Sequence, residues 1–314
     1  MKEEDLNELL MSHSATDILK FYSEFNDQEQ LVHWMMMRSS GPAEIYQING
    51  EGEIVVVIPT MSHKSKNSEK IANVLFKEIP IIFVESGSDS RLFNYARNCN
   101  LGIKAALEYE PKWIIISNDD MQMIDEPRIL VNSLSHLKAR YDNISAVYAS
   151  PSSYHSYPIF LGYPNLLRHF YFYLRNKETR TQVVLERKFG IDIVVQYFGK
   201  LQRNLFTTYT TIMNMGDFCI FSSEYIKQIG GKLFDEVYIN EFEEVELSYI
   251  LAKSGKTVEQ IPYRIGDKIG TSLGVGSVRR YRAIASRSYF NYKVKKKLID
   301  FKPDQKCKSL EDDI

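Results

Sequence analysis

The chain has 314 residues, of which 44% are hydrophobic and 25% are charged, as in an ordinary soluble globular protein of one large domain or two small ones. A formal net charge of −1 argues against a protein whose whole surface binds nucleic acid, although it does not exclude local basic patches. Cys99, Cys219 and Cys307 are far apart and form no CxxC or Cys/His cluster, so neither a disulfide framework nor a zinc site is indicated.

The N-terminus reads MKEEDLNELL, which is acidic and amphipathic and therefore unlike a secretory signal. No apolar run approaches the ~18 residues that a membrane span needs. We therefore expect a cytoplasmic protein that is at most peripheral to a membrane surface.

Residues 1–52 form the first expected unit, a helical extension packed on the next part of the chain. Apolar residues recur there at helical spacing, and the pattern ends at the glycine-rich turn Asn49–Gly52. The apolar residues are Leu6, Leu9 and Leu10, then Ile18, Phe21 and Tyr22, then Leu31, Trp34 and Met35.

From residue 53 to about 290 the pattern changes to strands alternating with helices. Short apolar strands separated by helical segments predict a mainly parallel sheet covered on both faces. The expected strands are Ile54–Ile58, Ile81–Glu85, Trp113–Ser117 and Ser145–Ala149. Between the second and third, the segment Arg91–Leu107 carries one apolar stripe at helical spacing.

The stretch Ile114–Asp120, reading IIISNDD, is an apolar run that stops on Asn118, Asp119 and Asp120. In open α/β sheets, ligands bind at the carboxyl ends of the strands. Carboxylates gathered there suit Mg²⁺ or Mn²⁺, and hence a phosphorylated substrate. Taken alone, the stretch fits a strand followed by an Asx-type turn better.

Residues 163–210 are dense in aromatic and basic side chains. A packed helical insertion is the favoured interpretation, because most aromatic residues fill cores. The alternative is a binding surface on the acceptor side, or one for a lipid headgroup.

The stretch Lys268–Ile299 contains no acidic residue, and a basic tail is expected over 291–314. Three glycines in the first part of Lys268–Ile299 could let backbone N–H groups approach a phosphate, although their spacing matches no standard phosphate-binding loop. A solvated basic helix and a contact with a diphosphate or an anionic membrane are equally compatible with this composition.

A second acidic cluster, comprising Glu241, Glu243, Glu244 and Glu246, lies where a helix is expected to begin. Acidic residues in a first turn are stabilised by the helix dipole, which is a sufficient structural reason for some of them. A carboxylate held there can also act as a general base, but spacing alone does not select which one.

The order of these segments resembles family 2 glycosyltransferases of the GT-A fold, over about residues 54–290. Three matching motifs come first: IVVVIPT ending at Pro59 and Thr60, VESGSDS with Glu85, and YARNCNLGIKAAL with Arg97. The Asn118-Asp119-Asp120 signature follows them. The last motif is Gly230…Phe234-Asp235-Glu236 followed by Glu243-Glu244-Val245-Glu246-Leu247. Each motif is weak, and their order and spacing together are moderately specific.

The resemblance implies a GT-A-like, Rossmann-like sheet and a role for each matched position. Pro59, Thr60, Glu85 and Arg97 would line the nucleotide pocket. Asp120 would hold Mn²⁺ or Mg²⁺ on the diphosphate, with Asn118 or Asp119 supporting the ribose or the metal. Glu244 would take the proton from the acceptor hydroxyl, and the sugar would be transferred with inversion.

Two departures from the family pattern stand out. Glu244 occupies the place where the family usually has Asp, and Glu243 beside it is a rival base. Asp267 lies about where many members have a metal-binding His, so it is either an altered metal ligand or a sign that the metal has been lost.

The resulting hypothesis is a metal-dependent inverting glycosyltransferase that uses a nucleotide-diphosphate sugar and a glycan, lipid-linked or protein acceptor, with no nucleic-acid partner. One alternative is a nucleotidyltransferase that makes a sugar nucleotide. The absence of glycine from PTMSHKSKNSEK after the first strand counts against it, because such enzymes need a glycine-rich loop there. The other alternative is a non-catalytic glycosyltransferase-like binding or scaffold protein.

Overall fold

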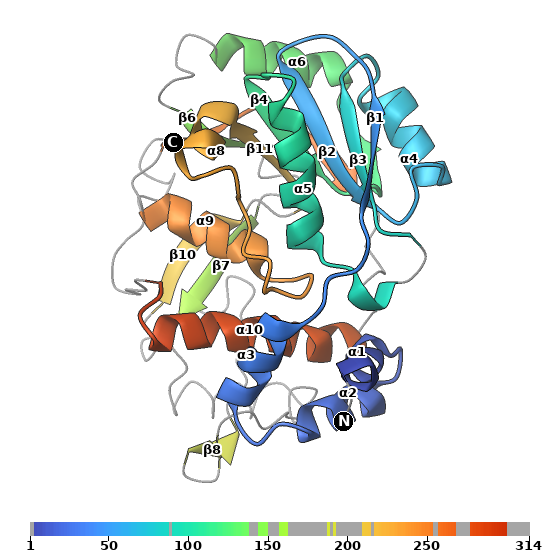
Figure 1. Ribbon diagram of the computed structural model, residues 1–314. Helices are drawn as coiled ribbons and strands as arrows, with labels where there is room; N and C mark the ends of the chain where they lie inside the picture. The colour runs from blue at the N-terminus through green and yellow to red at the C-terminus, as the bar shows by residue number, and fades with distance from the viewer. Residues whose placement is uncertain are drawn as a thin grey trace.

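The computed structural model describes residues 3–87, 90–137, 144–149, 157–162, 187–188, 191–192, 209–214, 217–253, 257–267 and 277–299. Its centre is a seven-stranded mixed sheet with helices on both faces (Figure 1), so the expected α/β class is confirmed. In spatial order the strands are β1 (Glu44–Ile48), β3 (Ile81–Glu85), β2 (Ile54–Thr60), β4 (Trp113–Ser117), β11 (Phe218–Ser222), β6 (Ile144–Tyr148) and β12 (Thr257–Gln260).

The strands of this sheet run mainly in one direction. β2 is parallel to both β3 and β4, and β12 is parallel to β6. β11 is antiparallel to both its neighbours, β4 and β6, and β1 is antiparallel to β3. The four strands expected from the sequence are therefore all present, and three strands of the sheet, the antiparallel β1 and β11 and the parallel β12, are additions that the sequence did not predict.

Strand β2 shows why the sheet is covered on both faces. Every residue of β2 is buried, and alternate side chains enter different cores. Val56 and Ile58 join one core, which includes η1 (Ile71–Leu75) and α6 (Pro127–His136). Val55 and Val57 join the other, which includes α5 (Tyr95–Leu107), α8 (Ser223–Gln228) and α9 (Glu243–Lys253).

Shorter elements complete the part of the chain that the structure describes. They are α4 (Lys66–Lys70), the 3-10 turn η2 (Ser90–Leu92), the strand pair β5 (Met121–Met123) with β13 (Ile265–Asp267), the pair β7 (Tyr157–Gly162) with β10 (Tyr209–Asn214), and the pair β8 (Arg187–Lys188) with β9 (Ile191–Asp192). Most of the expected helical insertion at 163–210 lies outside the described residues, and those described within it are strands.

The three helical patterns near the N-terminus form α1 (Glu3–Met11), α2 (Ala15–Ser23) and α3 (Gln28–Met37). They do not account for all of residues 1–52, because residues 44–48 form the edge strand β1. That strand is mostly exposed and is held by its hydrogen bonds to β3. Its sequence therefore lacked the buried apolar pattern that predicts a strand.

The basic C-terminal helix α10 (Ser277–Lys295) packs against α2 and α3 in a third core (Figure 1). Its residues 281–290 are all buried, so the expectation of a solvated basic helix is wrong. The Arg282 guanidinium, 3% exposed, donates to the carbonyl oxygens of Leu10, Met11 and Ser12. A cation at the end of α1 is stabilised by that helix's dipole. The glycine-containing loop at 268–276 and the tail from residue 300 onward lie outside the described residues.

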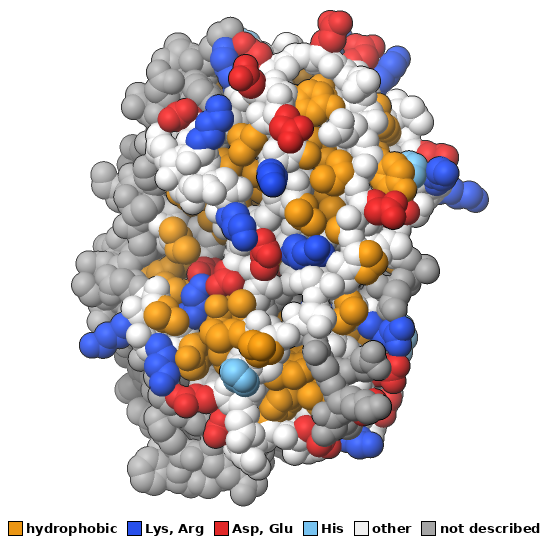
Figure 2. All heavy atoms as spheres, in the orientation of Figure 1, with side chains coloured by type: hydrophobic (Ala, Val, Ile, Leu, Met, Phe, Trp, Pro, Cys, Tyr) orange, Lys and Arg blue, Asp and Glu red, His pale blue; other side chains and the backbone are white. Residues whose placement is uncertain are grey.

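The surface in front of α5 carries acidic and basic side chains interspersed with apolar ones (Figure 2). They do not gather into a single positive patch on this face. None of the described helices combines the length and the hydrophobicity required to cross a membrane.

Gly102 allows α5 to lie against the sheet. A Cβ atom at this position would meet the Val57 side chain and would come within 2.9 Å of Val84 Cγ2. We expect Gly102→Ala to lower the free energy of unfolding by about 1–2 kcal/mol, because overpacking outweighs the gain of about 1 kcal/mol in helix propensity. Chemical denaturation measures this, with Lys104→Ala on the exposed face of α5 as the control. A stabilised Gly102→Ala protein would contradict the packing argument.

Candidate functional site

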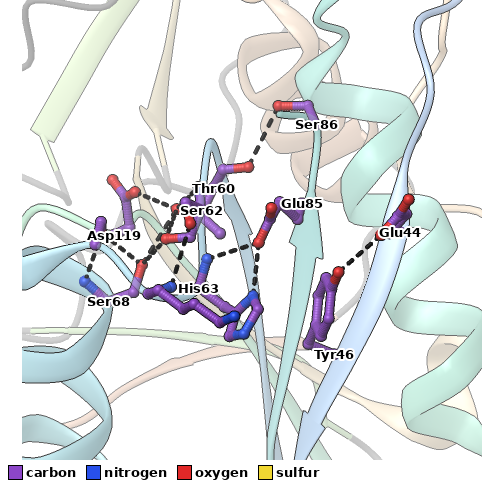
Figure 3. Close-up of polar contacts among 11 residues, drawn as sticks. Glu44, Tyr46, Thr60, Ser62, His63, Ser68, Glu85, Ser86 and Asp119 are labelled. Atoms are coloured by element: carbon purple, nitrogen blue, oxygen red, sulfur yellow. Dashed lines mark hydrogen bonds and ion pairs between the residues drawn. The ribbon is translucent and has the colours of Figure 1, made fainter. Parts of the chain in front are cut away.

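The carboxyl ends of β3, β2 and β4 meet at one edge of the sheet. The chain passes from β2 to β3 on one side, then returns to place β4 on the other side of β2. Such a reversal of direction is where open α/β sheets bind ligands. At this point the Thr60 hydroxyl donates to Asp119 Oδ2 over 2.6 Å and so joins the ends of β2 and β4 (Figure 3).

A serine-rich loop holds Thr60 and leads into α4. The Ser68 hydroxyl, fully buried, donates to the Ser62 carbonyl at 2.9 Å and lies 3.2 Å from the Thr60 hydroxyl. Ser65 caps α4 by accepting from the Ser68 backbone N–H at 3.0 Å. On the other side of Thr60, its carbonyl accepts the Ser86 backbone N–H at 3.0 Å. The loop is thus ordered by hydrogen bonds, not by glycine flexibility.

Glu85, at the end of β3, is held by His63 from the same loop. The backbone N–H of His63 donates to Glu85 Oε2 at 2.9 Å, and the ring Nδ1 lies 2.6 Å from the same oxygen. The backbone hydrogen bond from His63 is the main reason why the pKa of Glu85 is lowered. On β1, Tyr46 stacks on the His63 ring with the ring centroids 3.9 Å apart (Figure 3).

The residues after β4 lie at the same edge. The Asn118 backbone N–H donates to the Asp217 carbonyl at 3.1 Å, because β11 begins where β4 ends. Burial raises the pKa of Asp119, and the hydrogen bond from Thr60 partly offsets this. Pro59, one residue before Thr60, is opposite Val84 in the sheet register.

Asp120 and Asp267 are brought near each other along the backbone. Asp120 directly precedes β5, and the pairing of β5 with β13 puts Asp267 opposite Met121. Among the described residues, no group of three or more His, Cys, Asp or Glu side chains is arranged to hold a metal ion.

Arg97 and Asn100, from the helical motif on α5, have structural partners. Arg97 Nη1 donates to the Gly41 carbonyl at 2.6 Å, which ties α5 to the segment before β1. The buried Asn100 side chain accepts the backbone N–H groups of Leu233 and Phe234 at 3.1 and 3.2 Å. Both residues therefore fix the route of the chain around α5.

The second acidic cluster divides into two groups. In the first, Asp235 and Glu246 are neutralised by Lys293 on α10, with Nζ at 2.8 Å and 2.5 Å from their carboxylates. Tyr289 donates to Asp235 at 2.8 Å, and Tyr238 donates to Glu246. Burial opposes ionisation of Asp235, but the pairing with Lys293 lowers its pKa overall. This group joins α10 to the start of α9.

The second group consists of Glu241, Glu243, Glu244 and Asp217. Burial is the main cause that raises the pKa of each glutamate, and mutual repulsion adds to it. For Glu244 the pKa reaches about 8, with Asp217 and Glu241 as the repelling charges and Arg279 opposing them. Glu243 is only 3% exposed, and its Oε2 has no hydrogen-bond partner in the described structure. Glu244 is half-buried and lies at the first turn of α9.

Three members of the site, His63, Tyr46 and Asp217, were not predicted from the sequence. Asp217 precedes β11, a strand that was not expected, and Tyr46 lies on the equally unexpected β1. His63 follows the Pro59-Thr60 motif by three residues, and that position was the one available signal.

No protein-family model matches the chain, and no curated protein shows significant similarity to it.

Lys293 provides a test of the first group, in which it pairs with Asp235 and Glu246. Lys293→Met leaves the half-buried Asp235 and the buried Glu246 beside each other without their cation, so we expect the free energy of unfolding to fall by about 3 kcal/mol, at the low end of the range for a broken buried pair. The control is Lys296→Met, which removes an exposed ion pair with Glu29 and should cost less than about 1 kcal/mol. Equal losses in the two variants, measured by urea denaturation, would contradict this division of the cluster.

The pH dependence of stability tests the second group, through Glu243. Its pKa is raised on folding, so the unfolded chain releases this proton near the ordinary pKa of 4.5 while the folded chain retains it. Stability is therefore lost as pH rises above about 4.5. We expect Glu243→Gln, which cannot ionise, to have a higher Tm than the wild type at pH 8, with the difference vanishing toward pH 4.

The matched control for this measurement is Glu24→Gln, which removes a charge from an exposed position at the end of α2. Its Tm should follow that of the wild type at every pH. If Glu243→Gln did the same, the burial of an unpaired carboxyl group would not be limiting stability.

Proposed function

We propose that the protein is a metal-dependent inverting glycosyltransferase, which moves a sugar from a nucleotide-diphosphate sugar to an acceptor hydroxyl. The observation that carries the proposal is the arrangement at the strand ends. Carboxylates that suit a nucleotide-diphosphate donor lie at the end of β3 and just after β4, at the reversal point of the sheet, and a carboxyl group with a pKa of about 8 lies at the start of α9.

The strand order supports a GT-A-like form of the α/β fold. Parallel strands β3, β2 and β4 continue through the antiparallel β11 to the parallel pair of β6 and β12, as one sheet. The motifs that resemble family 2 glycosyltransferases fall at the ends of β2, β3 and β4 and at the start of α9. Fold alone does not define function, so the proposal depends on the chemistry of those positions.

On the donor side, Pro59, Thr60, Glu85, Asn118 and Asp119 would surround the nucleotide. The hydrogen bond between Thr60 and Asp119 and the two bonds between His63 and Glu85 supply an ordered framework. A site organised before the ligand arrives loses less entropy on binding. Arg97 has a lesser part in this proposal, because its guanidinium is engaged by Gly41.

Asp120 and Asp267 are the residues that would hold Mn²⁺ or Mg²⁺. The β5–β13 register brings their backbones together, and carboxylate oxygens are the donors that these hard cations prefer. When bound, such an ion would neutralise the charge of the departing diphosphate.

Glu244 is a better general base than Glu243. It is half-buried, whereas Glu243 is almost fully enclosed and has little access to an acceptor. A base with a pKa close to the working pH is also the most effective kind.

In the transfer step, Glu244 takes the proton of the acceptor hydroxyl, and the acceptor oxygen bonds to the anomeric carbon. The bond from that carbon to the diphosphate oxygen breaks at the same time, so the nucleoside diphosphate leaves and the configuration inverts.

The acceptor is a hydroxyl of a glycan, a lipid-linked sugar or a protein. The aromatic and basic segment that is expected on the acceptor side, at 163–210, lies largely outside the described residues.

The test is turnover of a panel of nucleotide-diphosphate sugars with Mn²⁺ or Mg²⁺, measured as release of nucleoside diphosphate. We expect Asp120→Ala to abolish metal-dependent turnover. Glu244→Gln should retain nucleotide binding in a thermal-shift assay and lose transfer by at least about 100-fold. Because Glu244 must be deprotonated to act, wild-type turnover should rise with pH toward about 8.

The control for these variants is Glu24→Gln, at the exposed C-cap of α2, far along the chain from the strand ends. Full transfer by both Asp120→Ala and Glu244→Gln would overturn the assignment of roles. Nucleotide binding without turnover by the wild type would favour a binding protein over an enzyme.

A further inference from the structure

The contacts of His63 give the proposed nucleotide site a feature that its motifs do not specify. Both donors of His63, the backbone N–H and the ring Nδ1, point at one oxygen of Glu85, Oε2 (Figure 3). Glu85 has a lowered pKa and is therefore an ionised carboxylate that can only accept hydrogen bonds. The ring must then donate from Nδ1, and both lone pairs of Oε2 are used.

Tyr46 fixes the plane of the His63 ring. The two rings are 24° from parallel, and the Tyr46 hydroxyl donates to Glu44 at 2.7 Å on the same edge strand. Glu85 is thereby held in one orientation, with His63 and Glu85 both about a quarter exposed, at 25% and 21% of their side-chain surfaces. Its second oxygen, Oε1, accepts no hydrogen bond from any described residue.

We propose that His63 is a specificity-determining residue, which leaves Glu85 a single accepting oxygen and thereby selects a uracil or thymine nucleotide over a guanine nucleotide. This inference rests on the proposed function and adds to it the class of nucleobase.

The preferred nucleobase follows from the number of N–H donors on its Watson–Crick edge. The Watson–Crick edge of uracil or thymine offers one N–H group between two carbonyl oxygens, which one accepting oxygen satisfies. Guanine offers two adjacent N–H donors, which pair best with both oxygens of a free carboxylate. Cytosine and adenine have an acceptor at the ring nitrogen, which a carboxylate repels. A site that leaves a polar group unpaired rejects the wrong ligand strongly.

The experiment is titration calorimetry of the full chain with UDP, TDP, GDP, CDP and ADP in the presence of Mn²⁺. We expect UDP and TDP to bind at least about tenfold more tightly than the other three, which corresponds to one hydrogen bond to a charged group. In His63→Ala a lone pair of Oε2 becomes free, so the ratio of UDP to GDP affinity should fall by about tenfold. In His63→Asn, whose amide can donate to Oε2, the ratio should be largely restored.

Tyr46→Phe keeps the ring stack and should keep the wild-type ratio. His136→Ala is the matched control, because His136 is exposed on α6 and its ring lies 2.6 Å from the Asn132 carbonyl of its own helix. A uniform loss of affinity for all five nucleotides in His63→Ala would give His63 a merely structural role and overturn the inference. A wild-type preference for GDP, CDP or ADP would overturn the base assignment alone, whereas binding of none of the five would overturn the proposed function with it.

Discussion

The position of β2 between β3 and β4 is the constraint on which the candidate site depends. Because the three strands are parallel, Thr60, Glu85 and Asn118 must all emerge at one edge, although they are far apart in the sequence. The Thr60–Asp119 hydrogen bond then joins two strand ends, and His63 joins the loop after β2 to the third. Thr60 and the short loop after β2 therefore tie together the ends of all three strands.

The acidic residues around the start of α9 differ in whether a cation compensates their charge. Asp235 and Glu246 share Lys293 and two tyrosine hydroxyls, so their charges are compensated. Glu243 and Glu244, a few residues away, have no such cation within hydrogen-bond reach in the described structure and hold their protons more tightly. Uncompensated burial costs stability, and proteins retain it mainly where function needs a shifted pKa.

The sequence predicted four strands and a helix from apolar patterns that face a core, but it missed the fully buried strand β11 and the edge strand β1, which is held by hydrogen bonds. The strand at 113–117 and the stripe on α5 were predicted because their apolar residues face cores. The edge strand β1 is exposed, so it had no such pattern. In α10 the basic residues were equally compatible with a solvated helix and with an anionic contact, yet Arg282 and Lys293 are enclosed by partners from α1 and α9, more than 40 residues distant in each case. Their burial is set by tertiary pairing.

The helix α10 connects the acidic residues near α9 to the N-terminal helices. Through Arg282 it holds the end of α1, through Lys293 it holds Asp235 and Glu246, and through Arg287 it reaches Glu241 at 3.5 Å. The three cations lie on one helix, which is packed against the N-terminal helices on one side and the start of α9 on another. The placement of Glu244 therefore depends on a helical layer outside the sheet. The N-terminal helices support the acidic side of the site through that layer, even though none of their residues belongs to it.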